Sequence, residues 1–111
     1  MLMRYGPIFP QREIAEDPGA IRAYAEAVRD LGYDHLLAYD HVLGADSTSR
    51  PGWNRYDVHD GFHEVFVLFG YLAAVVPELE LVTDVLILPQ RETALVAKQA
   101  AEVDILTGGK F

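Results

Sequence analysis

The sequence contains no cysteine, which excludes disulfide bonds and thiolate metal sites. Basic residues are also scarce: 9 Lys and Arg stand against 17 Asp and Glu, for a formal net charge of -8. This imbalance disfavours nucleic acid and anionic membrane surfaces as partners, because both repel a negatively charged protein. A phosphate-bearing cofactor stays possible, since it needs only a local cradle of donors.

Long hydrophobic runs are missing as well. The longest apolar stretch, residues 65–76, is too short to cross a bilayer, which needs about 20 residues. The first residues have no basic segment followed by an apolar core, so no secretory signal is expected and a cytoplasmic location is the default. Hydrophobic residues still make up 50% of the 111 residues, enough for one small domain spanning 1–111.

Apolar periodicity predicts alternating strands and helices. The strands are expected at residues 3–9, 34–39 and 79–88, and the helices at 17–32, 61–76 and 91–106. In the first helix, Asp17 suits the cap and Pro18 the first helical position. Five apolar residues of this helix share one face: Ile21, Tyr24, Ala25, Val28 and Leu31.

The predicted order, βαβαβα, joins parallel strands by right-handed crossovers and defines an α/β fold. Such units build either an open doubly wound sheet or a (β/α) barrel. A dinucleotide-binding fold is disfavoured, because residues 10–13 after the first strand lack the G-x-G-x-x-G fingerprint. Residues 110–111 are expected to begin a fourth strand.

Two segments are more apolar than a solvent-facing element allows. The helix 61–76 is apolar nearly all round, so we expect both of its sides to be buried, most simply by a second subunit. The near-continuous apolar run of strand 79–88 is typical of a parallel strand covered on both faces.

The strand 34–39 ends on Asp40 and His41, and an irregular loop follows. In repeating strand–helix chains, catalytic residues tend to lie at such strand ends. His41 could act as a general acid or base, or could be a solvated loop histidine. Asp40 could orient His41 or contact the loop.

Asp84 interrupts the apolar third strand, where a carboxylate is costly to bury without a partner. It either faces a polar pocket or forms a salt bridge with a basic residue such as Arg91. His59 and His63 lie four residues apart, yet they lack the H-E-x-x-H order, and no metal site is expected. Residues 44–60, with Trp53 and Tyr56, form either a functional loop or an ordered surface loop.

Several stretches together resemble the luciferase-like monooxygenase family, and most closely its branch that uses the deazaflavin coenzyme F-420. They are YDHVLGAD (39–46), FHEVFVLFGYLAA (62–74), LILPQR (86–91), AKQAAEVD (97–104) and TGGKF (107–111). Their order along nearly the whole chain carries the resemblance.

The resemblance implies a TIM (β/α)₈ barrel, usually a homodimer, with hydride transfer at the ring of F-420 or, alternatively, FMN. It places catalytic His41 beside the ring and a small-molecule substrate, with Asp40, Asp84 and Val85 as further cofactor contacts. It also implies a non-prolyl cis peptide, here Asp84-Val85, although Asp84 departs from the small or neutral residue expected there.

A complete barrel needs about 250 residues, so this chain is expected to be the N-terminal portion of one, with three of its βα units. As a fragment it would be inactive or would pair with copies of itself through helix 61–76 and its open sheet edges. The alternative is a non-catalytic oligomerising α/β module.

Overall fold

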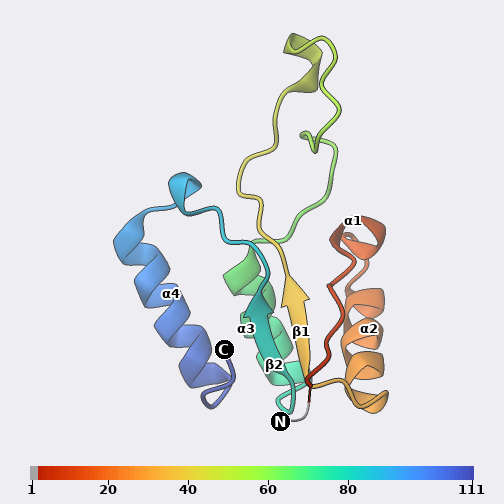
Figure 1. Cartoon of the computed structure of the whole chain (residues 1–111), viewed down its shortest axis with the longest axis vertical. Helices are drawn as coiled ribbons and strands as arrows, with labels where there is room; N and C mark the ends of the chain where they lie inside the picture. The colour runs from red at the N-terminus through yellow and green to blue at the C-terminus, as the bar shows by residue number, and fades with distance from the viewer. Residues whose placement is uncertain (1–2) are drawn as a thin grey trace.

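The computed structural model describes residues 3–111, which measure 46 × 32 × 30 Å (Figure 1). The elements, in chain order, are α1 (Gln11–Ile14), α2 (Pro18–Asp30), β1 (His35–Ala38), the 3-10 turn η1 (Ser47–Ser49), α3 (Val65–Val75), β2 (Glu80–Thr83), the 3-10 turn η2 (Leu88–Gln90) and α4 (Thr93–Leu106). The mixed α/β character and the parallel sheet agree with the prediction. None of the described helices combines the length and hydrophobicity needed to cross a bilayer.

The centre of the fold is a parallel pair of strands, in which His35 of β1 lies opposite Glu80 of β2. The predicted first strand, 3–9, is only partly formed and makes an isolated bridge to β1. Leu37 donates its N–H to the Pro7 carbonyl at 3.0 Å and accepts from Phe9 at 2.7 Å. Pro7 has no N–H to extend this ladder, which explains why a regular strand does not develop.

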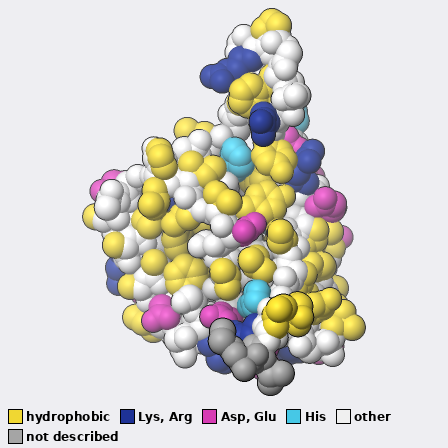
Figure 2. All heavy atoms as spheres, in the orientation of Figure 1, with side chains coloured by type: hydrophobic (Ala, Val, Ile, Leu, Met, Phe, Trp, Pro, Cys, Tyr) yellow, Lys and Arg dark blue, Asp and Glu magenta, His cyan; other side chains and the backbone are white. Residues whose placement is uncertain are grey.

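The sheet is covered on one face only. The helix α3 lies behind β1 and β2, flanked by α2 and α4, and no described helix lies in front of the strands (Figure 1). Figure 2 shows that the front face is largely hydrophobic. The strand β2 ends at Thr83, so it is shorter than the predicted 79–88. The expected burial of this segment on both faces is also wrong, because Leu81 is buried whereas Val85 is exposed.

The first long helix follows its sequence signals closely. The Asp17 carboxylate caps α2 by accepting from the Ala20 N–H at 3.0 Å, and Gly32 beyond its end has φ +80°. Ile21, Ala25 and Val28 are buried as predicted. Leu31 is exposed, contrary to the prediction, because it falls at the cap after the last helical residue.

The apolar helix α3 supplies much of the core. It begins later than predicted, because Glu64 caps it by accepting from the Val67 N–H at 2.8 Å. Phe69 and Leu72 are fully buried against the sheet and α2. Val67 is 70% exposed, so the outer side of α3 is open in the single chain, and its expected burial by a second subunit stays a prediction.

The last helix begins at the Glu92 cap, and Val103 is its buried residue. Leu95, in the first turn of the same helix, is exposed. After Gly108 and Gly109, both with positive φ, the Lys110 carbonyl accepts from the Leu81 N–H at 2.8 Å. Residue 110 therefore lies along the edge of β2 opposite β1, in the place that a further strand would take.

Candidate active site

An open hollow of about 370 Å³ lies at the carboxyl ends of β1 and β2. We call it the strand-end hollow. Parallel strands finish at the same edge of a sheet, so residues that follow different strands meet there. All of the residues predicted to be in the site line it, together with Ile8, Tyr39, Tyr56 and Ile87: they are Asp40, His41, Asp84 and Val85.

The His41 side chain is held by aromatic rings. Its ring centroid lies 4.7 Å from that of Phe62 and 5.5 Å from that of Tyr56, which it meets edge-on. Its Nδ1 atom is buried and has no hydrogen-bond partner among the described residues. A buried polar atom of this kind is costly to leave unpaired, so His41 offers a ligand an unused hydrogen-bonding position.

Tyr39 and Tyr56 add aromatic rings to the lining of the hollow, and Phe62 packs against both. Tyr39 stacks on Tyr56 at 6.3 Å, and Phe62 meets Tyr39 at 5.7 Å and Tyr56 at 5.0 Å. Burial is the main cause that raises the pKa of the Tyr39 hydroxyl, which keeps it protonated. The sequence drew attention to aromatics in the loop 44–60, and Tyr56 is one of them; Tyr39 and Phe62 were missed as site residues, because both resemble ordinary core positions.

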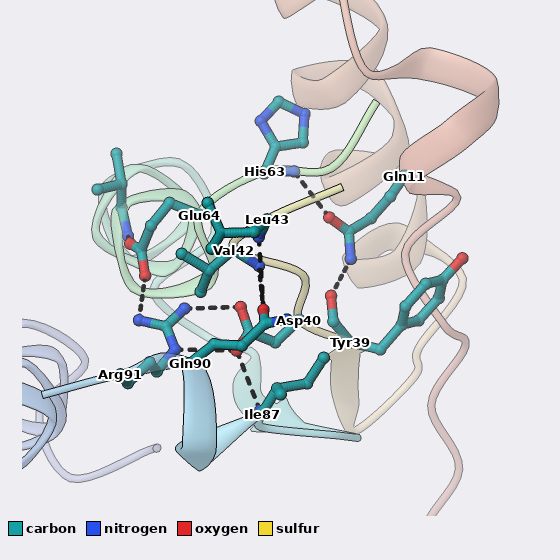
Figure 3. Close-up of polar contacts among 11 residues, drawn as sticks. Gln11, Tyr39, Asp40, Val42, Leu43, His63, Glu64, Ile87, Gln90 and Arg91 are labelled. Carbon is teal, nitrogen blue, oxygen red and sulfur yellow. Dashed lines mark hydrogen bonds and ion pairs between the residues drawn. The ribbon is translucent and has the colours of Figure 1, made fainter. Parts of the chain in front are cut away.

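Asp40 is 1% exposed, and its carboxylate points toward Arg91 (Figure 3). Arg91 donates two hydrogen bonds to this carboxylate, from Nε to Oδ2 at 2.9 Å and from Nη2 to Oδ1 at 2.6 Å. The remaining Nη1 pairs with Glu64 Oε1 at 2.7 Å. The hydrogen bond from Asp40 is the main cause that raises the pKa of Arg91, so this buried arginine stays charged.

The proposed salt bridge between Asp84 and Arg91 is therefore wrong. Asp40 is the better partner because it lies in the interior, where an unpaired carboxylate would be costly, whereas Asp84 is exposed. Arg91 stood out in the sequence because it ends the stretch LILPQR (86–91). No pattern in the sequence indicated which carboxylate it would pair with.

Further hydrogen bonds fix the two strand ends against each other (Figure 3). The Ile87 N–H donates to Asp40 Oδ2 at 3.1 Å. The N–H groups of Val42 and Leu43 both donate to Gln90 Oε1, at 3.2 and 3.4 Å. These contacts hold the backbone on both sides of His41, and sequence reasoning missed the part played by Gln90.

The peptide bond between Asp84 and Val85 is trans, as are all bonds of the described residues. The expected cis bond is therefore wrong. The trans form is favoured by about 3 kcal/mol at a non-prolyl bond. In this conformation the Val85 carbonyl accepts from the Asp40 N–H at 3.1 Å, which ties the two strand ends together.

Gln11 is a buried amide that the sequence did not single out. Its Nε2 donates to the Tyr39 carbonyl, and its Oε1 accepts from the His63 N–H at 3.0 Å (Figure 3). Burial lowers the pKa of the His63 imidazole, which favours its neutral form. His59 and His63 do not share a helical face, because α3 begins only at Val65.

The loop 44–60 projects beyond the strand-end hollow as a closed finger (Figure 1). The Val58 N–H donates to the Ala45 carbonyl at 3.0 Å, and Ser47 Oγ donates to Asp57 Oδ2 at 2.7 Å. The Ser47 hydrogen bond is the main cause that lowers the pKa of Asp57. A Cβ atom at Gly44 would lie 2.8 Å from the Val58 Cα, so the base of the finger closes only around glycine.

A parallel α/β sheet with an aromatic hollow at its strand ends is an arrangement typical of enzymes that bind a small ligand there. The sequence model of the luciferase-like monooxygenase family matches residues 3–111, and the chain belongs to this family. Members of the family are flavin-type oxidoreductases that use FMN or F-420. A search of curated proteins gives no significant match to the chain.

Proposed function

We propose that the strand-end hollow binds the ring of a flavin-type cofactor, F-420 in preference to FMN, and that the chain contributes to oxidation or reduction of a small-molecule substrate. The observation that carries the proposal is the unpartnered Nδ1 of His41 in a wall of aromatic rings. The volume of the hollow, about 370 Å³, falls within the range of ligand pockets. Its apolar rings and the His41 imidazole, whose buried Nδ1 has no hydrogen-bond partner among the described residues, fit a flat heteroaromatic group.

The proposed roles follow from the contacts. His41 holds or moves a proton at Nδ1, and Phe62 fixes the orientation of its ring. Val85 and Asp84 also line the hollow and offer the ligand one apolar and one polar side chain. Asp40 is a positioning residue, because both of its oxygens are already engaged by Arg91 and Ile87. The bound cofactor would supply hydride transfer.

We further propose that these elements are the first units of a (β/α)₈ barrel whose interior is the uncovered face of the sheet. The parallel pairing of β1 with β2 and the hydrophobic front face in Figure 2 support this arrangement. With that face uncovered the hollow is open to water, so we expect the 111-residue chain alone to bind the ring weakly and to turn over no substrate.

Cofactor binding is tested by titrating the chain with F-420 and with FMN while following quenching of the ring fluorescence. We expect saturable quenching, stronger for F-420, that His41→Ala reduces about tenfold, as for loss of one hydrogen bond to a buried group. His59→Ala is the matched control, because His59 is an exposed histidine of the loop. Equal quenching in both variants, or none with either cofactor, would favour the non-catalytic module.

We also propose self-association through the outer side of α3. Val67, Tyr71 and Ala74 recur at helical spacing and are exposed, and they form an apolar stripe. A shallow apolar hollow of about 260 Å³ borders the stripe where α3 meets α2, and a second copy could fill it.

Size-exclusion chromatography with light scattering tests this stripe. We expect a dimer or larger species that becomes monomeric in Val67→Glu, since a buried unpaired charge opposes association. Thr48→Glu, a charge added on the finger, should leave the assembly intact. A monomer over the whole concentration range would refute self-association.

A further inference from the structure

A second hollow, of about 320 Å³, lies between α1 and the returning limb of the finger. Its lining consists of Arg12, Asn54, Arg55, Tyr56 and Asp60, and we call it the arginine hollow. Tyr56 also lines the strand-end hollow, so one tyrosine separates the two spaces. A ligand that occupies the first hollow could therefore reach the second by passing this ring.

Arg12 is held in place before any ligand binds. Its guanidinium lies over the Tyr56 ring at 5.1 Å, and its Nε donates to Asp60 Oδ1 at 2.6 Å. The two terminal nitrogens make no hydrogen bond or ion pair with the described residues. They remain available as paired donors, the arrangement that suits phosphate and carboxylate.

The charges around the arginine hollow favour an anion. Arg55 forms no ion pair with any described residue, whereas both oxygens of Asp60 are engaged, one by Arg12 and one by the Asp57 N–H at 2.9 Å. The lining of the hollow therefore carries two cations against one carboxylate, in a chain whose net charge is -8. Figure 2 shows basic side chains on the finger and at its base, above a mainly hydrophobic body.

We infer that the arginine hollow binds a phosphate or carboxylate group of the ligand whose ring occupies the strand-end hollow. The ring part of this inference rests on the proposed function. The anion part extends that function by naming the chemical class of another group of the same ligand. Arg12 and Arg55 bind the anion, Asn54 adds an amide donor, and Tyr56 separates the anion from the ring.

The anion site is tested without any ring. Inorganic phosphate is titrated into the full chain while NMR follows the arginine Nε–H signals. We expect saturable shifts at Arg12 and Arg55, with affinity about tenfold weaker in Arg55→Gln, as for loss of one charge-assisted hydrogen bond. Arg50→Gln is the matched control, because Arg50 lies on the same finger over Trp53, 5.2 Å from its ring centroid.

A comparison of FMN with riboflavin distinguishes whether the anion belongs to the cofactor or to the substrate. If it belongs to the cofactor, the chain binds FMN about tenfold more tightly than riboflavin, and Arg55→Gln removes this preference. If it belongs to the substrate, FMN and riboflavin bind equally, and phosphate still binds the FMN-loaded chain. Absence of saturable phosphate shifts, or an equal loss in Arg50→Gln, would overturn the inference.

The proposed ring binding and the proposed anion binding can be contradicted independently. His41→Ala should weaken ring quenching and leave the phosphate shifts unchanged. Ring binding without phosphate binding would contradict only the arginine hollow. Phosphate binding without ring binding would contradict the proposed function and leave an anion site.

Discussion

Replacing Arg91 with methionine should lower the free energy of unfolding by about 3–5 kcal/mol. The substitution leaves the Asp40 carboxylate buried, with no cation in reach, and removes the ion pair with Glu64 at the start of α3. Urea denaturation followed by circular dichroism measures the change. A small domain has little more than this to lose, so partial unfolding at room temperature is within the expected result.

Two variants make the Arg91 result specific. Arg22→Met removes an exposed ion pair with Glu26 and should change stability by less than about 0.5 kcal/mol. Adding Asp40→Asn to Arg91→Met removes the buried charge and should recover part of the loss. If Arg91→Met is as stable as the wild type, Asp40 is not held in the way described.

Truncating Phe69 to alanine is expected to cost about 3–5 kcal/mol as well, for a different reason. Phe69 is 0% exposed and lies at the centre of the core, with its ring 5.8 Å from that of Phe111. Its removal would leave a cavity between α3, the sheet and the last residues of the chain. Thermal unfolding should report a lower midpoint, with loss of near-ultraviolet signal from the aromatic core.

Val67→Ala is the control for this second prediction. Val67 lies on the same helix with its side chain turned outward, so its truncation should change the stability of a single chain by less than about 0.5 kcal/mol. Measurement at low protein concentration keeps any self-association out of the comparison. Equal losses for Phe69 and Val67 would mean that the outer side of α3 is buried in solution.

The sequence was informative where local rules decide the structure. Asp17, Pro18 and Gly32 marked the ends of α2, because capping and positive φ are properties of a few neighbouring residues. The ends of the first and third strands were misjudged. Pro7 interrupts the ladder of the first, and the third ends at Thr83, although its apolar run continues.

For the candidate site, sequence reasoning located the strand ends but not the contacts between them. Asp40, His41, Asp84 and Val85 meet because parallel strands finish together, which the alternation of elements predicts. The partner of Arg91 could not be predicted, since Asp40 and Asp84 are both near it in the expected topology. Gln11 was missed because a glutamine beside a proline in a connecting segment has no distinctive pattern.

The contacts that hold the strand-end hollow join residues far apart along the chain, and this has a consequence for how the protein folds. Gln11 reaches Tyr39 and His63 across separations of 28 and 52 residues, and Arg91 reaches Asp40 across 51. Closing such long loops lowers chain entropy before any contact compensates, so these polar pairs should form late, after the helices. A folding intermediate that precedes these contacts would have helices and a partial core, but the His41 ring would have no fixed orientation.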